Sequence, residues 1–252
     1  MALIHSVPQT VTEGLVLYLD PANIKSYPGS GNTLNDLTSN QINLSGTTLN
    51  TTTDAGATVF NFNGSTQISS TFTPISNSGP DGQNAWSLAW WSRSTGTTPS
   101  NYRAVIRLRD TNYLNTNHPG YFLQIDTRET TNSRIHNYQK MYDGSTSESA
   151  WSASTIATNA EWTSGSWFCQ GISHVISPVL SKPIFTTFNN GAQVNSRINN
   201  LAFSGYGNVN YISLNTANGN TVHMGPVAIY NRRLSQPEFK KFFDAHKARF
   251  GY

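Results

Sequence analysis

Charged residues are scarce in this chain. Lys and Arg number 16 and Asp and Glu 13 among 252 residues, so 12% of positions are charged and the net charge is +3. Disordered chains are normally rich in charge and poor in aromatics, whereas 12% of this chain is aromatic, which argues against disorder. The basic residues form only short clusters, such as Arg107 with Arg109, and not the long basic stripe of a nucleic-acid-binding protein. We therefore expect no nucleic-acid partner.

Cysteine and long apolar runs are also lacking. Cys169 is the single cysteine, which excludes an intrachain disulfide and a metal site built from cysteines. It lies five positions before His174 on one predicted strand, hence on the opposite face, and we expect a buried, inert thiol. No segment reaches the ~18 apolar residues of a membrane helix, so we expect no membrane partner. Residues 1–14 lack a basic region followed by an apolar run, and we expect no signal peptide.

Small polar residues are abundant instead. Ser (29), Thr (29) and Asn (28) favour turns and pleated surfaces over helices, which excludes a helical bundle or a coiled coil. Short alternating segments separated by turn signals predict an all-β fold, a two-sheet antiparallel jelly-roll sandwich. The expected strands are 15–19, a hairpin over 58–72, 85–93, 102–108, 121–126, 134–142, 167–175, 184–188, 192–198, 211–214 and 221–230.

The chain shows no linker and no repeat. We expect an extended arm over residues 1–13 and a single domain over residues 14–252. One amphipathic helix is predicted at about 235–250, because Ser235 and Glu238 form a capping box and Phe239, Phe242 and Phe243 share one face.

Several segments together carry a family resemblance. The opening GLVLYLD (14–20) with YPGSG (27–31), the segments FNGS (62–65), WSLAW (86–90) and FNNG (188–191), and above all the ending GPVAIYNRRLS (225–235) resemble laminin-G-like, concanavalin-A-like jelly rolls. The resemblance spans residues 14–252 and is to domains that are common in virion proteins of tailed phages, marine and cyanobacterial ones especially. It implies a jelly-roll fold and a structural role in a phage particle.

Catalytic motifs are missing from the sequence. A retaining glycosidase needs two carboxylates about 5 Å apart, normally at alternating positions of one strand, and no such acidic run occurs. The chain also lacks a Gly-x-Ser-x-Gly elbow and a His-Glu-x-x-His zinc motif. We therefore expect no enzyme, and a glycan hydrolase ranks last among the alternatives.

We expect no cofactor and no metal site. Calcium is the alternative, because laminin-G-like domains often bind it, and the resemblance would place Asp20, Asp36 and Asp54 near one end of the fold. Calcium usually requires 6–8 oxygen ligands with several carboxylates. Turn-forming roles for these three residues are therefore the favoured interpretation.

Glycan binding needs an aromatic platform flanked by polar side chains. Trp91 and Arg93 alternate with the presumed core residues Trp86, Leu88 and Trp90, and therefore lie on the other face of their strand. Trp151 and Trp162 stand in a Ser-, Thr- and Asn-rich section. These residues are candidates for sugar binding or for a protein interface. The alternative is that the tryptophans belong to the core.

The favoured hypothesis is a virion structural protein, such as a capsid decoration or cement protein. Its expected partners are the major capsid protein or tail proteins, in a homo-oligomer or symmetric array, and its expected location is the virion, assembled in the host cytoplasm. The second hypothesis is a lectin-like module of a tail or fibre that binds host surface glycans.

Overall fold

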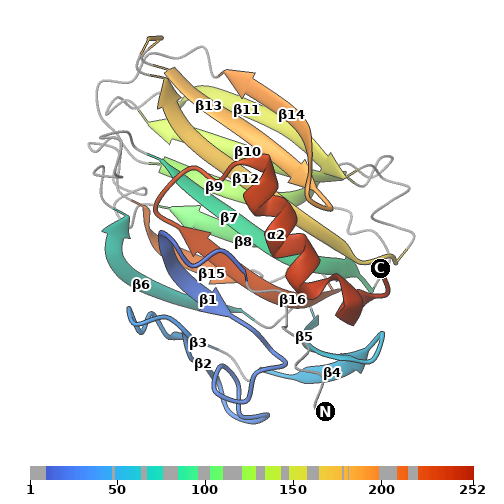
Figure 1. Ribbon diagram of the computed structural model, residues 1–252. Helices are drawn as coiled ribbons and strands as arrows, with labels where there is room; N and C mark the ends of the chain where they lie inside the picture. The colour runs from blue at the N-terminus through green and yellow to red at the C-terminus, as the bar shows by residue number, and fades with distance from the viewer. Residues whose placement is uncertain are drawn as a thin grey trace.

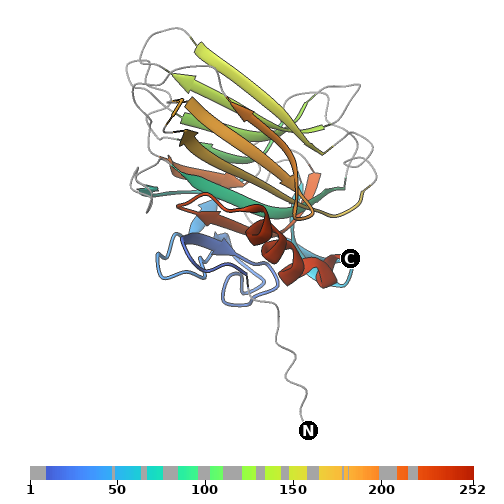
Figure 2. The same cartoon turned by 45° about the horizontal axis from the view of Figure 1, so that its top comes forward.

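In its described residues the chain folds into two antiparallel β-sheets packed face to face, with one α-helix on the outside (Figure 1). The computed structural model describes residues 10–46, 49–63, 67–75, 85–95, 103–109, 121–128, 134–142, 148–157, 165–177, 179–180, 182–198, 209–214 and 221–252. Each sheet has eight strands, and Figure 2 shows the two layers from a second side. The predicted all-β sandwich is thus confirmed. Residues 1–9 of the predicted arm lie outside the described residues.

Sheet A carries the helix on its outer face. Its central strand is β16, which pairs with β7 on one side and with both β5 and β1 on the other. In spatial order its strands are β14 (Ala192–Ile198), β13 (Lys182–Asn189), β12 (Phe168–Ser177), β7 (Trp86–Ser94), β16 (Thr221–Tyr230), β5 (Ala57–Asn63) and β4 (Thr51–Asp54), with β1 (Leu15–Leu19) beside β16.

Sheet B forms the second layer. In spatial order its strands are β11 (Glu148–Ala157), β10 (Arg134–Tyr142), β9 (Tyr121–Arg128), β8 (Arg103–Arg109), β15 (Val209–Leu214), β6 (Ile68–Ile75), β3 (Leu44–Gly46) and β2 (Thr33–Leu34).

The main core lies between the two sheets. Strand β7 shows how alternation builds it, because Trp86, Leu88 and Trp90 are buried against residues of sheet B such as Leu108 and Ile212. The residues in between face outward into a second apolar layer beneath the helix. Both faces of β7 are therefore buried, which explains why this strand lacks the polar outer face of a solvated sheet.

The C-terminal helix α2 (Gln236–His246) continues as the 3₁₀ turn η2 (Lys247–Phe250), which confirms the predicted helix. Glu238 accepts hydrogen bonds from the backbone N–H and the hydroxyl of Ser235, both at 2.8 Å, which is the reciprocal half of the capping box. Phe239 and Phe242 are buried against sheet A. Gly251 ends the turn in the left-handed conformation, at φ 83°. Among the described residues, none of the helices is long and apolar enough to span a membrane.

The predicted hairpin over residues 58–72 is wrong. Strands β5 and β6 belong to different sheets, so the chain crosses from one layer to the other between them. Both edges of β5 are already occupied, by β4 and by β16, which leaves no edge for β6. The true hairpin joins β4 to β5 through Ala55 and Gly56, whose φ angles of 51° and 82° match the tight turn that suits twisted strands.

Candidate functional site

Trp91 lies in the apolar layer between sheet A and the helix. Its side chain is fully buried, and its ring stacks on Phe250 at 4.4 Å and on Phe243 at 5.5 Å between ring centroids. A sugar cannot reach this ring in the folded protein. The prediction that Trp91 is a sugar platform is therefore wrong. Trp91 does lie on the face of β7 that alternation predicts, but the C-terminal segment covers this face and makes it part of the core.

Arg93 lies on the same face of β7 and forms an ion pair. Its Nε is 2.9 Å from the Oδ2 of Asp54, and His223 bonds the same carboxylate oxygen through Nδ1. The Asp54 side chain is only 10% exposed. Arg93 and His223 therefore compensate a mostly buried carboxylate, and this bond joins β4 to β7 and β16.

Asp20 and Asp36 also have structural roles. Both carboxylate oxygens of Asp20 accept hydrogen bonds from Nη1 of Arg249, at 2.9 and 2.7 Å. Asp36 accepts from the backbone N–H groups of Tyr18 and Thr38, both at 2.9 Å, and so fixes the loop after β2. Within the described ranges, no cluster of three His, Cys, Asp or Glu side chains could hold a metal ion.

Cys169 and His174 occupy opposite faces of β12, as their spacing predicts. Cys169 lies in the layer beneath the helix, whereas His174 stacks on Trp86 in the core between the sheets, with ring centroids 5.4 Å apart. Burial raises the pKa of the Cys169 thiol well above its usual value. A neutral, buried thiol is a poor nucleophile, so this residue is a packing element.

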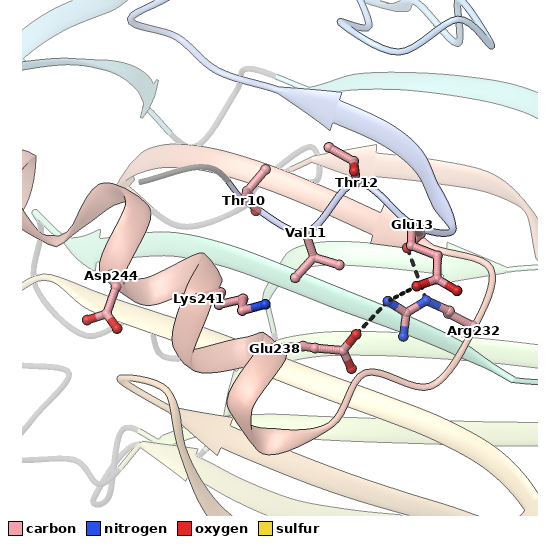
Figure 3. A pocket seen from close by; sticks show the side chains of 8 residues that line it. All are labelled: Thr10, Val11, Thr12, Glu13, Arg232, Glu238, Lys241 and Asp244. Atoms are coloured by element: carbon pink, nitrogen blue, oxygen red, sulfur yellow. Dashed lines mark hydrogen bonds and ion pairs between the residues drawn. The ribbon is translucent and has the colours of Figure 1, made fainter. Parts of the chain in front are cut away.

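A groove of about 590 Å³ separates the segment before β1 from helix α2 (Figure 3). Among its lining residues, Nη2 of Arg232 lies 2.5 Å from Glu238 and 3.8 Å from Glu13. Burial opposes ionisation of Glu238, but hydrogen bonds from Arg232 and Ser235 outweigh it and lower its pKa to about 2. The groove is lined by Thr10, Val11, Thr12, Glu13, Arg232, Glu238, Lys241 and Asp244. Because Arg232 and Glu238 neutralise each other, the groove offers neither of them as a free charge.

The outer face of sheet B, the face turned away from the core, is the second candidate surface. Leu108, Ile212 and Ile68 belong to the core between the sheets, so the residues that alternate with them on β8, β15 and β6 occupy this outer face. The pairing register extends the same face across β9, β10 and β11. The helix does not cover it, because α2 lies against sheet A (Figure 1).

Two rows of residues cross this face. The first alternates aromatic and cationic positions over five neighbouring strands and ends at a threonine on a sixth. We name it the aromatic–cation row: Trp151, Lys140, Phe122, Arg109, Tyr211 and Thr71. Two positions along the strands lies the hydroxyl–amide row: Tyr138, Gln124, Arg107, Ser213, Ser69, Ser45 and Thr33.

The described side chains of these rows differ in exposure: some are accessible, and Ser213 is buried. Arg107, Ser69 and Tyr211 are half-buried, and Thr71 is exposed. Ser213 is 1% exposed, and its hydroxyl has no hydrogen-bond partner within the described part of the chain. An unpaired buried hydroxyl costs free energy, so Ser213 is an exception to the rule that buried polar groups are hydrogen-bonded.

The two remaining sequence candidates have different outcomes. Register places Trp151 at the start of the aromatic–cation row, where it pairs with Lys140. Trp162 lies outside the described residues. The sequence alone does not reveal the other members of both rows. Only the pairing register of strands that are far apart in the chain brings these residues together.

Comparison with known proteins gives the fold. No protein-family model and no curated protein matches the chain. Among solved structures it is similar to the binding domain of Paraclostridial mosquitocidal protein 1 (TM-score 0.58, 15% identity, 91% of this chain and 52% of that one). It is also similar to the binding domain of botulinum neurotoxin serotype D (TM-score 0.59, 14% identity, 92% and 51%).

A third similar structure is of botulinum neurotoxin type C, and its stated subject is the interaction of that toxin with two ganglioside molecules (TM-score 0.60, 12% identity, 92% and 51%). The chain thus spans about half the length of each of these structures. At such low identity the likeness establishes a jelly-roll-like β-sandwich of the kind found in toxin binding domains. The phage and laminin-G parts of the sequence resemblance stay a prediction.

Proposed function

We propose that this protein is a non-catalytic carbohydrate-binding module whose ligand face is the outer face of sheet B. The observation that carries the proposal is the aromatic–cation row beside the hydroxyl–amide row. A sugar ring has an apolar C–H face and a rim of hydroxyl groups. A ligand of this kind needs aromatic rings next to hydrogen-bonding side chains, and the two rows supply both kinds of residue side by side.

The size of the face also fits an oligosaccharide. Neighbouring strands lie about 4.8 Å apart, so a row of six strands spans roughly 24 Å. This length corresponds to several linked sugar rings. The similar structures are binding domains, and one concerns a ganglioside-binding toxin, which supports a glycan as the ligand class.

Four carboxylates among the described residues have structural partners. Asp20, Asp54 and Glu238 are each paired with an arginine, and Asp36 is held by backbone donors. A retaining glycosidase would instead need two carboxyl groups about 5 Å apart that face the substrate. These four residues therefore favour a binding protein over a hydrolase.

A glycan array probed with the full chain tests the proposal. We expect binding to at least one glycan, and Trp151→Ala should weaken it about tenfold, since an aromatic stacking contact contributes about 1 kcal/mol or more. Tyr252→Ala is the matched control, because this half-exposed aromatic residue packs against Trp91 beneath sheet A. Absence of any glycan binding, or equal affinities of wild type and Trp151→Ala, would overturn the proposal, and release of reducing sugar would refute its non-catalytic part.

The location of the module is a separate proposal, which the sequence resemblance alone supports. We propose that it is displayed on a phage particle, next to capsid or tail proteins. Immunogold electron microscopy of purified particles with an antibody to this chain tests this. Gold on the particle surface is the expected result, and unlabelled particles would contradict it.

A further inference from the structure

Strand β14 leaves one edge of sheet A unpaired. Within the described part of the chain its hydrogen-bonded neighbour is β13 alone, and β14 ends the strand order of the sheet (Figure 1). Such an edge presents backbone N–H and C=O groups that can pair with a strand of another molecule. Every side chain that the structure describes on β14 is exposed, so the strand is accessible to a partner.

Residues 194–198 of β14 form a pattern that reads the same in both directions. The sequence is Val-Asn-Ser-Arg-Ile, that is, apolar, polar, serine, polar, apolar. Val194 and Ile198 are 52% and 48% exposed, and of the large apolar side chains exposed in the described residues these two alone lie on a strand. A two-fold symmetric interface requires a surface that is complementary to itself, and this pattern meets that requirement.

We propose that β14 pairs with β14 of a second copy of this chain, antiparallel about a two-fold axis at Ser196. In this register Val194 of each copy lies opposite Ile198 of the other, so the pairing removes two exposed apolar side chains of each copy from water. Ser196 lies opposite its own counterpart. Arg197 takes the position opposite Asn195, so two cations do not occupy directly opposite positions. No other two-fold register pairs Val194 with Ile198.

The paired segment is short, which limits the affinity of the dimer. The register between β13 and β14 shifts between Thr187 and Phe188, so Val194 is the extra residue of a bulge and regular pairing of β14 begins at Asn195. Five residues of a strand span about 17 Å. A standard interface has roughly 20–30 residues a side, so we expect a weak dimer that forms in a concentration-dependent manner.

The symmetry of this dimer fixes how the two copies face. A two-fold axis that relates antiparallel neighbours in a sheet is perpendicular to the sheet, so both copies of sheet B lie on the same side of the joined sheet A. Their outer faces then point in one direction, and the dimer presents two carbohydrate-binding faces to one surface, which raises avidity without a new contact. This consequence rests on the proposed function, whereas the dimer itself does not.

Sedimentation equilibrium of the full chain, from about 5 to about 500 μM, tests the dimer without any ligand. We expect the mass to rise from 27.7 kDa toward twice this value. Ile198→Lys should stay monomeric, because a lysine on an edge strand opposes pairing. Ile24→Lys is the matched control, since Ile24 is 76% exposed in the turn after β1, and it should dimerise like wild type. A constant mass of 27.7 kDa, or a dimer that Ile198→Lys does not weaken, would overturn the inference.

Disulfide cross-linking tests the register independently of the lysine variant. Ser196→Cys should form a disulfide between two copies on mild oxidation, because directly opposite residues have Cβ atoms about 4.5–5.5 Å apart. Val194→Cys is the matched control, since the same register separates the two copies of this exposed position by about 13 Å. The native Cys169 is buried and does not compete. Equal cross-linking of both variants, or of neither, would refute the pairing at Ser196.

Discussion

His246 links the helix to β1 through two hydrogen bonds, and this arrangement predicts how stability depends on pH. Its Nδ1 lies 2.8 Å from the carbonyl oxygen of Phe242, which only accepts, so Nδ1 carries the hydrogen. Its Nε2 therefore accepts from the hydroxyl of Tyr18, also at 2.8 Å. The ring is 3% exposed. Burial, reinforced by the positive charge of Arg249, lowers the pKa of His246 from 6.5 to about 4, against the opposing effects of the Phe242 carbonyl and Asp20.

The lowered pKa has a definite sign and size. Between about pH 6.5 and pH 4 the unfolded chain binds a proton at His246 that the folded protein does not. The free energy of unfolding therefore decreases as the pH is lowered through this window. A shift of about 2.5 pKa units corresponds to roughly 3 kcal/mol when the loss is complete below pH 4. About 2 kcal/mol of this should be lost between pH 7 and pH 5.

Urea unfolding at a series of pH values measures this loss. The variant His246→Gln keeps an acceptor for Tyr18 but cannot be protonated, so the difference between wild type and variant isolates the contribution of this one histidine. We expect the wild type to lose about 2 kcal/mol more than the variant between pH 7 and pH 5. If both curves have the same slope in this window, the histidine is not held neutral by burial and the reasoning is refuted.

Two further predictions concern the attachment of the helix. Gly171→Ala places a Cβ 2.3 Å from the ring of Phe239, so we expect a loss of about 1–3 kcal/mol in urea unfolding; unchanged stability would show that the helix does not pack closely on β12. Glu238→Gln removes the ion pair with Arg232 and weakens the cap at Ser235, and we expect a loss of about 1 kcal/mol at pH 7. Because the pKa of Glu238 is lowered to about 2, the advantage of wild type should decline from about pH 4.5 downward, and a difference that is independent of pH would contradict this.

Much of the fold could be predicted from local patterns. Apolar alternation located strands such as β7 and β16, and the capping box at Ser235 located the helix. The pattern failed where strands have few apolar residues. Strand β4 is Thr-Thr-Thr-Asp, and β11 is rich in Ser and Ala, so neither shows the alternation of apolar and polar residues that predicts a strand.

The candidate site could be predicted less well, for a physical reason. Alternation assigns Trp91 to one face of its strand, but Phe243 and Phe250, about 150 residues later, decide whether that face is covered. The rows on sheet B arise from pairing between strands that are distant in the chain. Arg109 and Tyr211 are opposite each other, although about 100 residues separate them.

The central position of β16 has a consequence for synthesis and folding. This strand fills the gap between β7 on one side and β5 and β1 on the other, although about 130 residues separate it from β7 along the chain. Until residues 221–230 leave the ribosome, β7 and β5 each have an open edge, which can pair with other chains. A truncation before residue 221 therefore divides sheet A into two parts. We expect such a product to aggregate, and we expect the intact domain to fold slowly because β16 must pair with strands that are distant in the chain.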